Sequence, residues 1–254
     1  MSDSADIPHS HASEIPEPPW LRRARPKRAR VPLSREAIVD AALRVLDRKG
    51  AAGISMRDVA VELGTGVSAI YWHVANKEQL IQLILDRVIA ELPQPEPDPE
   101  RWQEQLKQAA RDSRALMQRY PGIAQLSFGR VPLGPNAIRH IEWHLSVLRA
   151  GGLPNRVAAL AGDLIFLYVG GFAYEESLGM ATPTEEASFH EFLDEMRAYL
   201  ASLPADSFPN IVELADELTA GGPDERFEFG IEVLVGGLAA YAERHDEGRV
   251  TRPS

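Results

Sequence analysis

The segment from Val67 to His73 holds the residue types best suited to contact a nucleic acid. Val67, Ser68, Tyr71 and Trp72 share the exposed face of a short predicted helix, from which side chains can reach base edges or phosphates. Aromatic side chains are costly to leave on a surface without a partner, so this segment favours a binding surface. The alternative is that Tyr71, Trp72 and His73 are ordinary core residues.

A second candidate for phosphate chemistry is a basic run near the N-terminus. From Pro18 to Arg35 there is no acidic residue, although the whole chain carries a formal net charge of −10. The basic residues of this run are Arg22, Arg23, Arg25, Lys27, Arg28, Arg30 and Arg35. Such asymmetry is typical of a basic arm on an acidic body, although a solvated tail has the same composition.

His140 and His144 are the third candidate, because histidines four residues apart on a helix can ligate zinc. Ile141 stands where the zinc-protease pattern has glutamate, and pocket-lining histidines are commoner than ligands. The chain has no cysteine, which excludes disulfides, thiolate metal sites and cysteine nucleophiles. We therefore predict no catalytic residue, no metal and no cofactor. A metal-dependent enzyme and a helical protein-binding adaptor remain as alternatives.

Helices with clear start signals must position the first candidate. Ser34 is the predicted N-cap of a first helix, Ser55 and Asp58 form a capping box for a second, and Asn76 with Gln79 opens another. The turn at 65–67 separates the second helix from the short helix that carries Tyr71. Two short helices joined by a glycine-containing turn after a longer helix predict a helix-turn-helix, with Ala60 and Ile70 facing inward.

The rest of the chain is divided by its prolines and glycines. We expect disorder at 1–33 and 247–254, a helix-turn-helix domain at 34–92, a proline-rich linker at 93–99 and a helical domain at 100–246. No segment alternates as a strand does, so the fold class is all-α. No apolar run approaches the roughly 20 residues that a membrane helix needs. We expect a soluble, cytoplasmic protein with no membrane partner.

These residues allow a family resemblance to be stated. Residues 34–92 resemble the DNA-binding domain of the tetracycline-repressor (TetR) family in the segments 38–43, 55–60 and 63–64, and above all in Tyr71-Trp72-His73-Val74-Ala75-Asn76-Lys77-Glu78. Beyond residue 95 the likeness is weaker, but Arg226-Phe227-Glu228-Phe229-Gly230 is similar to the ligand-binding domain of the tetracycline-repressor subgroup. The resemblance implies a repressor released from its operator by a small molecule such as an antibiotic or other natural product.

The resemblance also implies roles for residues at the DNA. Arg57 would approach a phosphate or base, and Val67, Ser68 and Ala69 would occupy the base-reading positions. Tyr71, Trp72 and His73 would pack on the DNA backbone, and Lys77 with its helix N-terminus would hold a phosphate. We hypothesise that the arm residues Arg22 to Arg30 add affinity that depends steeply on salt, and such an arm could insert into the adjacent minor groove, as flexible arms do in other DNA-binding proteins.

In the C-terminal domain the resemblance implies an effector pocket and a homodimer. The expected ligand-contacting residues are His140, Trp143 and His144 on one helix, Phe166 and Glu175 on another, and Phe128 in a loop. The tetracycline-binding members hold a magnesium–drug chelate with a loop histidine, and the corresponding loop here, 126–129, has none. We therefore expect a bulky, partly aromatic natural product or drug instead of a tetracycline.

The dimer is expected to form from helices at about 154–178 and 224–245, paired with their symmetry mates. The sequence offers four glycines for close approach and four apolar contacts, although these could also be intrachain core; they are Gly170, Gly171, Gly236, Gly237, Leu234, Val235, Leu238 and Tyr241. Such a dimer would bind a pseudo-palindromic operator with two recognition helices roughly 34–36 Å apart.

Overall fold

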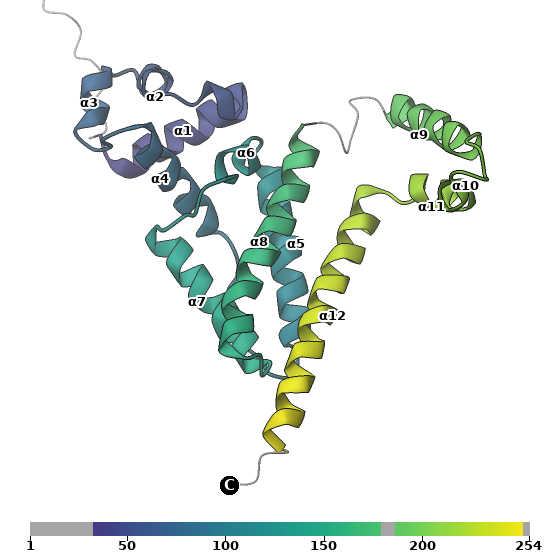
Figure 1. The fold of residues 1–254 in the computed structure, drawn as a ribbon. Helices are drawn as coiled ribbons and strands as arrows, with labels where there is room; N and C mark the ends of the chain where they lie inside the picture. The colour runs from purple at the N-terminus through teal and green to yellow at the C-terminus, as the bar shows by residue number, and fades with distance from the viewer. Residues whose placement is uncertain (1–32, 179–185, 251–254) are drawn as a thin grey trace, which may run out of the picture. The chain divides into compact units, whose positions relative to one another are not determined.

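The computed structural model describes residues 33–178 and 186–250, with side chains placed for 33–178 and 191–244. Every regular element among these residues is a helix, so the predicted all-α class is confirmed (Figure 1). The N-terminal helices are α1 (Arg35–Lys49), the 3-10 turn η1 (Ala51–Gly53), α2 (Met56–Glu62), α3 (Val67–Tyr71) and α4 (Lys77–Ile89). The later helices are α5 (Trp102–Arg119), α6 (Ile123–Ser127), α7 (Pro135–Ala150), α8 (Asn155–Ser177), α9 (Glu186–Ala201), α10 (Pro209–Glu213), α11 (Ala215–Thr219) and α12 (Pro223–Val250).

The predicted helix starts are confirmed by the capping hydrogen bonds. The Ser34 hydroxyl accepts from the Ala37 amide, and the Ser55 hydroxyl accepts from the Asp58 amide. At α4 the Asn76 side chain accepts from the Gln79 amide, while the Gln79 side chain accepts from the Ala75 amide, one residue before the cap. These bonds satisfy amides that have no partner within the helix, which fixes where each helix begins.

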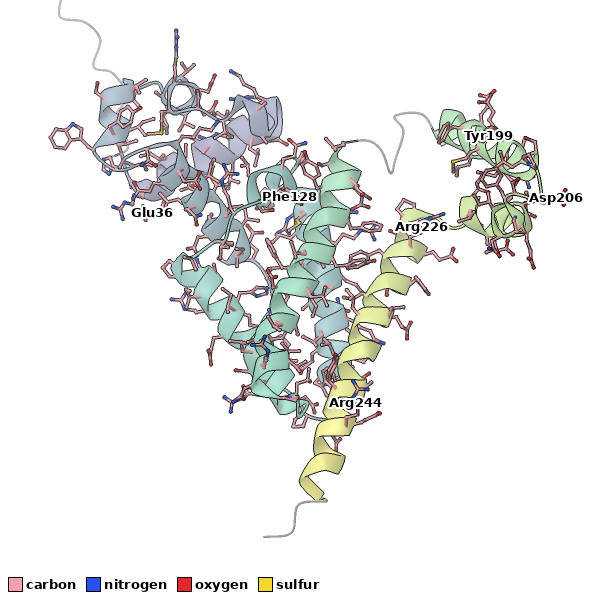
Figure 2. All side chains as sticks on the ribbon, in the orientation of Figure 1. Glu36, Phe128, Tyr199, Asp206, Arg226 and Arg244 are labelled. Atoms are coloured by element: carbon pink, nitrogen blue, oxygen red, sulfur yellow. The ribbon has the colours of Figure 1, made fainter. Side chains whose placement is uncertain are left out.

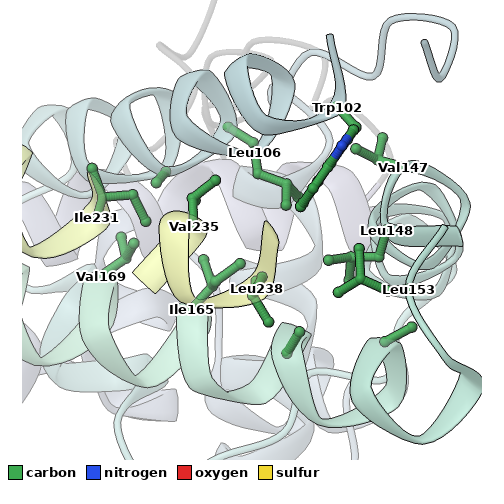
Figure 3. Packing of buried hydrophobic residues seen from close by; sticks show 14 of the residues in the cluster. Trp102, Leu106, Val147, Leu148, Leu153, Ile165, Val169, Ile231, Val235 and Leu238 are labelled. Carbon is green, nitrogen blue, oxygen red and sulfur yellow. The ribbon is translucent and has the colours of Figure 1, made fainter. Parts of the chain in front are cut away.

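The core of the C-terminal domain lies where α5, α7, α8 and α12 meet (Figure 3). Each helix contributes an apolar stripe at helical spacing, and the largest fully buried side chains are aromatic or branched aliphatic. Examples are Leu106 on α5, Val147 on α7, and Phe227 and Ile231 on α12. These contacts hold α12 against α8 and against α5, which lies more than a hundred residues earlier in the chain.

The residues from Arg226 to Gly230 make the contacts that pack α12 against α8 and α5. Phe227 is fully buried, and the Tyr168 hydroxyl on α8 donates to the Phe227 carbonyl oxygen over 2.9 Å. A Cβ at Gly230 would lie 2.2 Å from the Tyr168 hydroxyl oxygen, so only glycine allows this approach. Glu228 accepts two hydrogen bonds from Arg111 on α5. This segment therefore joins three helices.

The proline-rich linker is attached to the C-terminal domain. Trp143 on α7 donates its indole N–H to the Pro95 carbonyl oxygen over 2.6 Å. The Gln105 side chain on α5 donates to the Glu96 carbonyl oxygen and accepts from the Asp98 amide. Trp143 thus supports the linker as well as lying among the predicted ligand-contacting residues.

The predicted loop at 126–129 is partly wrong, because Leu126 and Ser127 belong to helix α6. This helix is a single short turn that follows Pro121-Gly122, and sequence periodicity gives almost no signal over five residues. Ile123, Ala124 and Leu126 are nevertheless buried. Phe128 caps the C-terminal end of α6 in extended conformation.

Helices α9 and α8 each have a further feature. Helix α9 contacts α10 and α11. Helix α8 is the one described helix long and apolar enough to cross a membrane by length and composition, a test that the core helix of a soluble protein also passes. Four buried residues of α8 belong to the core, namely Ala158, Ala161, Ile165 and Val169. Ala173, which is also buried, continues the same stripe by one turn.

Candidate DNA-binding and effector sites

Helices α2 and α3 form the predicted helix-turn-helix. They contact each other, and α2 packs against α1. Ala60 on α2 and Ile70 on α3 are almost completely buried, as expected for residues that fix the angle between the two helices. Helix α3 has no side-chain cap, since Gly66 stands at its N-cap.

The aromatic residues at the end of α3 face outward. Trp72 is 88% exposed and Tyr71 is 52% exposed, so the alternative that these two are core residues is wrong. Ser68 is exposed on the same helix, while Val67 and Ala69 are half-buried. A large aromatic surface is therefore presented beside small side chains at the predicted base-reading positions.

The half-buried His73 and the exposed Lys77 follow at the junction of α3 with α4. The His73 carbonyl oxygen accepts from the Arg35 guanidinium over 3.1 Å, which ties the end of α3 to the start of α1. Lys77 is the first residue of α4, directly after the Asn76 cap. Arg57 is exposed on α2. The predicted arm residues Arg22, Arg23, Arg25, Lys27, Arg28 and Arg30 lie outside the described residues.

Three of the four cations of α1 are paired with acids of α2. Arg44 and Arg48 both pair with Glu62, and Lys49 pairs with Asp58 over 2.7 Å. The hydrogen bonds from Arg48 and Arg44 lower the pKa of Glu62 to about 2. These bridges link α1 to α2. Arg57 and Lys77 are exposed cations of the helix-turn-helix and of the start of α4.

His140, Trp143 and His144 form an aromatic cluster on α7. The His140 ring lies 4.4 Å from the His144 ring and 6.0 Å from the Trp143 ring, measured between centroids. Burial, with a smaller contribution from the neighbouring His144, lowers the pKa of His140 to about 3, and burial also lowers the pKa of His144. His144 Nδ1 contacts the His140 carbonyl oxygen over 3.1 Å, whereas the buried His140 Nδ1 has no hydrogen-bond partner in the described structure. Both imidazoles are therefore neutral at physiological pH.

The other predicted ligand-contacting residues lie on α6 and α8. Phe128 stacks on Tyr174 of α8 with ring centroids 5.2 Å apart, and its position beside α8 is visible in Figure 2. Phe166 is 37% exposed, and Glu175 is exposed. Two surface hollows of about 540 and 480 Å³ lie along α7, and of the six predicted residues only Trp143 lines either of them. In the described structure four of the six predicted residues lie in two separate aromatic groups, Phe128 with Tyr174 and His140 with Trp143 and His144. Phe166 and Glu175 belong to neither group.

Helices α8 and α12 each carry a second apolar face that no other described residue covers. On α8 this face holds Leu160, Leu164 and Leu167, which are 47–58% exposed. On α12 it holds Phe229, Val233 and Tyr241, which are 50–71% exposed. A Cβ at Gly171, Gly236 or Gly237 would meet no atom within 4 Å.

The residues predicted for the dimer contact are thereby partly corrected. Val235 and Leu238 are buried in the intrachain core, and Leu234 packs against it. Tyr241 is exposed as expected. The sequence did not separate the two faces, because α12 is apolar on both of them, and only the packing on α5 and α8 shows which face remains free.

A buried ion pair that the sequence did not reveal lies between α5 and α8. Arg114 donates to Glu176 over 2.5 Å, and the two side chains are 10% and 11% exposed. The guanidinium also lies over the rings of Phe172 and Phe227, 5.1 and 4.8 Å from their centroids. Hydrogen bonding to Glu176 raises the pKa of Arg114. The spacing of 62 residues between the two partners gives no local signal.

Two models of known protein families match this chain. The model for the N-terminal domain of bacterial regulatory proteins of the tetR family matches residues 38–84, and the model for the tetracyclin repressor-like C-terminal domain matches residues 94–242. The chain belongs to the TetR family. Members of this family are generally non-enzymatic, soluble proteins that bind operator DNA, respond to small-molecule effectors and act as dimers. This chain is accordingly a ligand-responsive, DNA-binding transcriptional regulator.

Individual TetR-family relatives cover nearly the whole chain. The transcriptional repressor DrrR1 of Streptomyces coeruleorubidus is 32% identical over 90% of this chain and 86% of its own length. The class C tetracycline repressor of Escherichia coli is 26% identical over 81% of this chain and 90% of its own. The structure of apo ActR from Streptomyces coelicolor is 40% identical, covers 84% of this chain and 98% of ActR, and has a TM-score of 0.77. ActR has also been solved in complex with actinorhodin, with a TM-score of 0.76 to this chain, 40% identity, and 83% and 97% coverage.

Proposed function

We propose that this TetR-family regulator is a dimeric repressor that a planar, polycyclic aromatic natural product releases from its operator. The observation that carries the DNA-binding half of this proposal is the exposed pair Tyr71 and Trp72 directly beyond the fully buried Ile70. One turn of helix thus anchors the recognition helix and presents its aromatic surface. Trp72 is 88% exposed, and such a large apolar side chain at the surface favours a binding partner that covers it.

We assign the DNA contacts to three groups of residues. Val67, Ser68 and Ala69 read bases, largely through methyl contacts and DNA shape, since they offer few hydrogen-bonding groups. Tyr71, Trp72 and His73 pack on the sugar-phosphate backbone. The exposed cations Arg57 and Lys77 neutralise phosphates, and the basic arm, Arg22, Arg23, Arg25, Lys27, Arg28 and Arg30, extends into the adjacent minor groove.

The free apolar faces of α8 and α12 supply the dimer contact. Both faces belong to long helices that already pack against each other through their opposite sides. These faces would pair with the same faces of a second copy around a two-fold axis. The exposed residues that would meet there are Leu160, Leu164 and Leu167 on α8 and Phe229, Val233 and Tyr241 on α12. The bare glycines Gly171, Gly236 and Gly237 permit close approach of the helices.

The effector proposal rests on the aromatic groups and on one relative. Phe128 with Tyr174, and His140 with Trp143 and His144, offer flat rings on α6, α7 and α8, with Phe166 and Glu175 further along α8. Neutral imidazoles and aromatic faces suit a flat, uncharged or weakly acidic ring system. ActR, 40% identical to this chain, binds actinorhodin, and we infer a ligand of related shape here.

Release follows from a shift of population between two arrangements of the dimer. A ligand that binds one arrangement more tightly enriches it by the ratio of the two affinities, and DNA enriches the other. The chain performs no catalysis in this scheme and acts in the cytoplasm, where operator DNA is found.

The DNA-binding half is tested by fluorescence anisotropy. A duplex from upstream of the protein's own gene is compared with an unrelated duplex across a salt series. We expect selective binding that weakens when Lys77 is changed to alanine and when residues 1–31 are removed. A selection from random sequences that enriches no duplex would contradict the proposal.

A further inference from the structure

One face of α4 is polar and contacts the segment that leads into α7. Glu78, Gln82 and Asp86 stand four residues apart, so they lie along one line of the helix. Glu78 pairs with Arg130 over 3.1 Å, and the Gln82 side chain lies 3.4 Å from the Val131 carbonyl oxygen and from the Leu133 amide. Asp86 makes the last and most extensive of these contacts.

Asp86 caps the N-terminus of α7 from another helix. Its Oδ1 atom accepts from the Asn136 amide over 2.8 Å and from the Ala137 amide over 3.0 Å, while Oδ2 accepts from the Asn136 side chain over 3.0 Å. The backbone carbonyl oxygen of Asp86 accepts a further bond from Asn136. The residue at the N-cap of α7 itself is Gly134, which has no side chain to serve this purpose.

The Asp86 carboxylate occupies the space that a side chain at position 134 would need. A Cβ at Gly134 would lie 2.2 Å from Asp86 Oδ1 and 2.3 Å from its Cγ. Any other residue at position 134 must therefore displace the carboxylate. The contact can be broken from either helix by a small substitution.

The other contacts of the polar face are weaker links. The Glu78 and Arg130 side chains are 56% and 32% exposed, and exposed ion pairs contribute little to stability. The Gln82 contacts are at the long limit of a hydrogen bond. Asp86, in contrast, places a carboxylate on free amides at the positive end of the α7 dipole.

We propose that Asp86 is the positioning residue that joins the effector site to the DNA-binding domain, by fixing α4 to the first turn of α7. His140, Trp143 and His144 follow on the next turns of α7, so a ligand that moves their helix moves its N-terminus. Asp86 then transmits the movement to α4, whose first residue is Lys77 at the DNA. This inference rests on the proposed function, because it presumes that DNA and effector act on one equilibrium.

The test uses the reciprocity of linkage and therefore needs no ligand. If α4 and α7 are coupled through Asp86, binding of operator to the α3–α4 side changes the stability of the first turns of α7. An operator duplex is first selected from random sequences on the full wild-type chain. Hydrogen exchange of the α7 amides is then measured with and without that duplex in wild type, Asp86→Ala, Asp86→Asn and Gly134→Ala.

In the wild type we expect the duplex to change the exchange rates in α7 by at least about fivefold. Asp86→Ala and Gly134→Ala should abolish this change while retaining operator binding. Asp86→Asn should keep it, because an amide oxygen still accepts from the Asn136 and Ala137 amides. A double variant, Asp86→Ala with Gly134→Ala, should show the same loss of the DNA-dependent exchange change as either single variant, since both substitutions break the same contact.

Three controls separate a positioning role from a purely structural one. Gln82→Ala, on the same face of α4, should keep the DNA-dependent change, as should Asp47→Ala on the exposed side of α1. Circular dichroism establishes that each variant is folded. A DNA-dependent change of wild-type size in folded Asp86→Ala would overturn the proposal, whereas failure to select any duplex from the wild type would count against the proposed function instead.

Discussion

Replacement of Trp72 by alanine separates DNA contact from folding. In the free protein this side chain is 88% exposed, so it makes few intrachain contacts to lose. Surface substitutions of this kind usually change the free energy of unfolding by less than about 0.5 kcal/mol. We therefore expect the melting temperature of Trp72→Ala to stay close to that of the wild type.

Operator affinity should respond much more strongly. A tryptophan buries roughly 150–250 Å² when it is fully covered, and packing of one face on a DNA backbone covers about 100 Å². At about 25 cal/mol per Å² this corresponds to about 2.5 kcal/mol, or a 50- to 100-fold loss in affinity, as an order of magnitude.

Anisotropy titrations at several salt concentrations provide the assay. Trp72→Ala should weaken operator binding without changing the slope of log K against log salt, because no charge is removed. Lys77→Ala should reduce that slope by about 0.9, the amount expected for one phosphate contact. Val61→Ala, which removes a 75% exposed apolar side chain from α2, is the matched control. Wild-type affinity in Trp72→Ala, or a large loss of stability, would refute the assignment of Trp72 to the DNA surface.

Three further predictions concern the C-terminal domain. Glu176→Leu leaves the buried guanidinium of Arg114 without its main partner and should lower the free energy of unfolding in urea by about 3–5 kcal/mol, most of it regained when Arg114→Met is added; a loss below about 1 kcal/mol would contradict this. The folded-state pKa of His140, about 3, lies below its ordinary value of 6.5, so stability should fall as pH falls through that interval, because only the unfolded chain takes up the proton. Between pH 7 and 5 the wild type should lose roughly 1–2 kcal/mol more than His140→Leu, and parallel pH curves for the two proteins would disprove the burial argument. Leu164→Glu with Leu167→Glu should convert the dimer to monomer in analytical ultracentrifugation, and an unchanged dimer would exclude this face of α8 as the interface.

The helix-turn-helix was predictable from sequence because its signals are local. Ser34, Ser55 and Asn76 cap helices through bonds to amides three residues away, and a spacing of three residues can be read directly. The inward position of Ile70 and the outward position of Tyr71 and Trp72 follow from helical periodicity in the same way.

The features that sequence did not reveal depend on residues far apart in the chain. Asp86 and Asn136, and Arg114 and Glu176, are separated by 50 and 62 residues, and nothing local marks them as partners. The assignment of Val235 and Leu238 to the dimer contact failed because α12 is apolar on two faces. The polar residues Glu78, Gln82 and Asp86, which stand four residues apart on α4, are the one signal that could have pointed to the contact with α7.

The most direct test of ligand-controlled DNA binding uses a preformed complex of the full chain with its labelled operator. Actinorhodin, the ligand of the relative ActR, is titrated first, followed by hydroxylated naphthoquinones and anthraquinones. Tryptophan fluorescence reports ligand binding, and anisotropy of the labelled DNA reports release in the same sample. The account predicts that the ligand which quenches tryptophan also releases the operator over the same concentration range. A ligand that saturates the protein while the operator stays fully bound would contradict it.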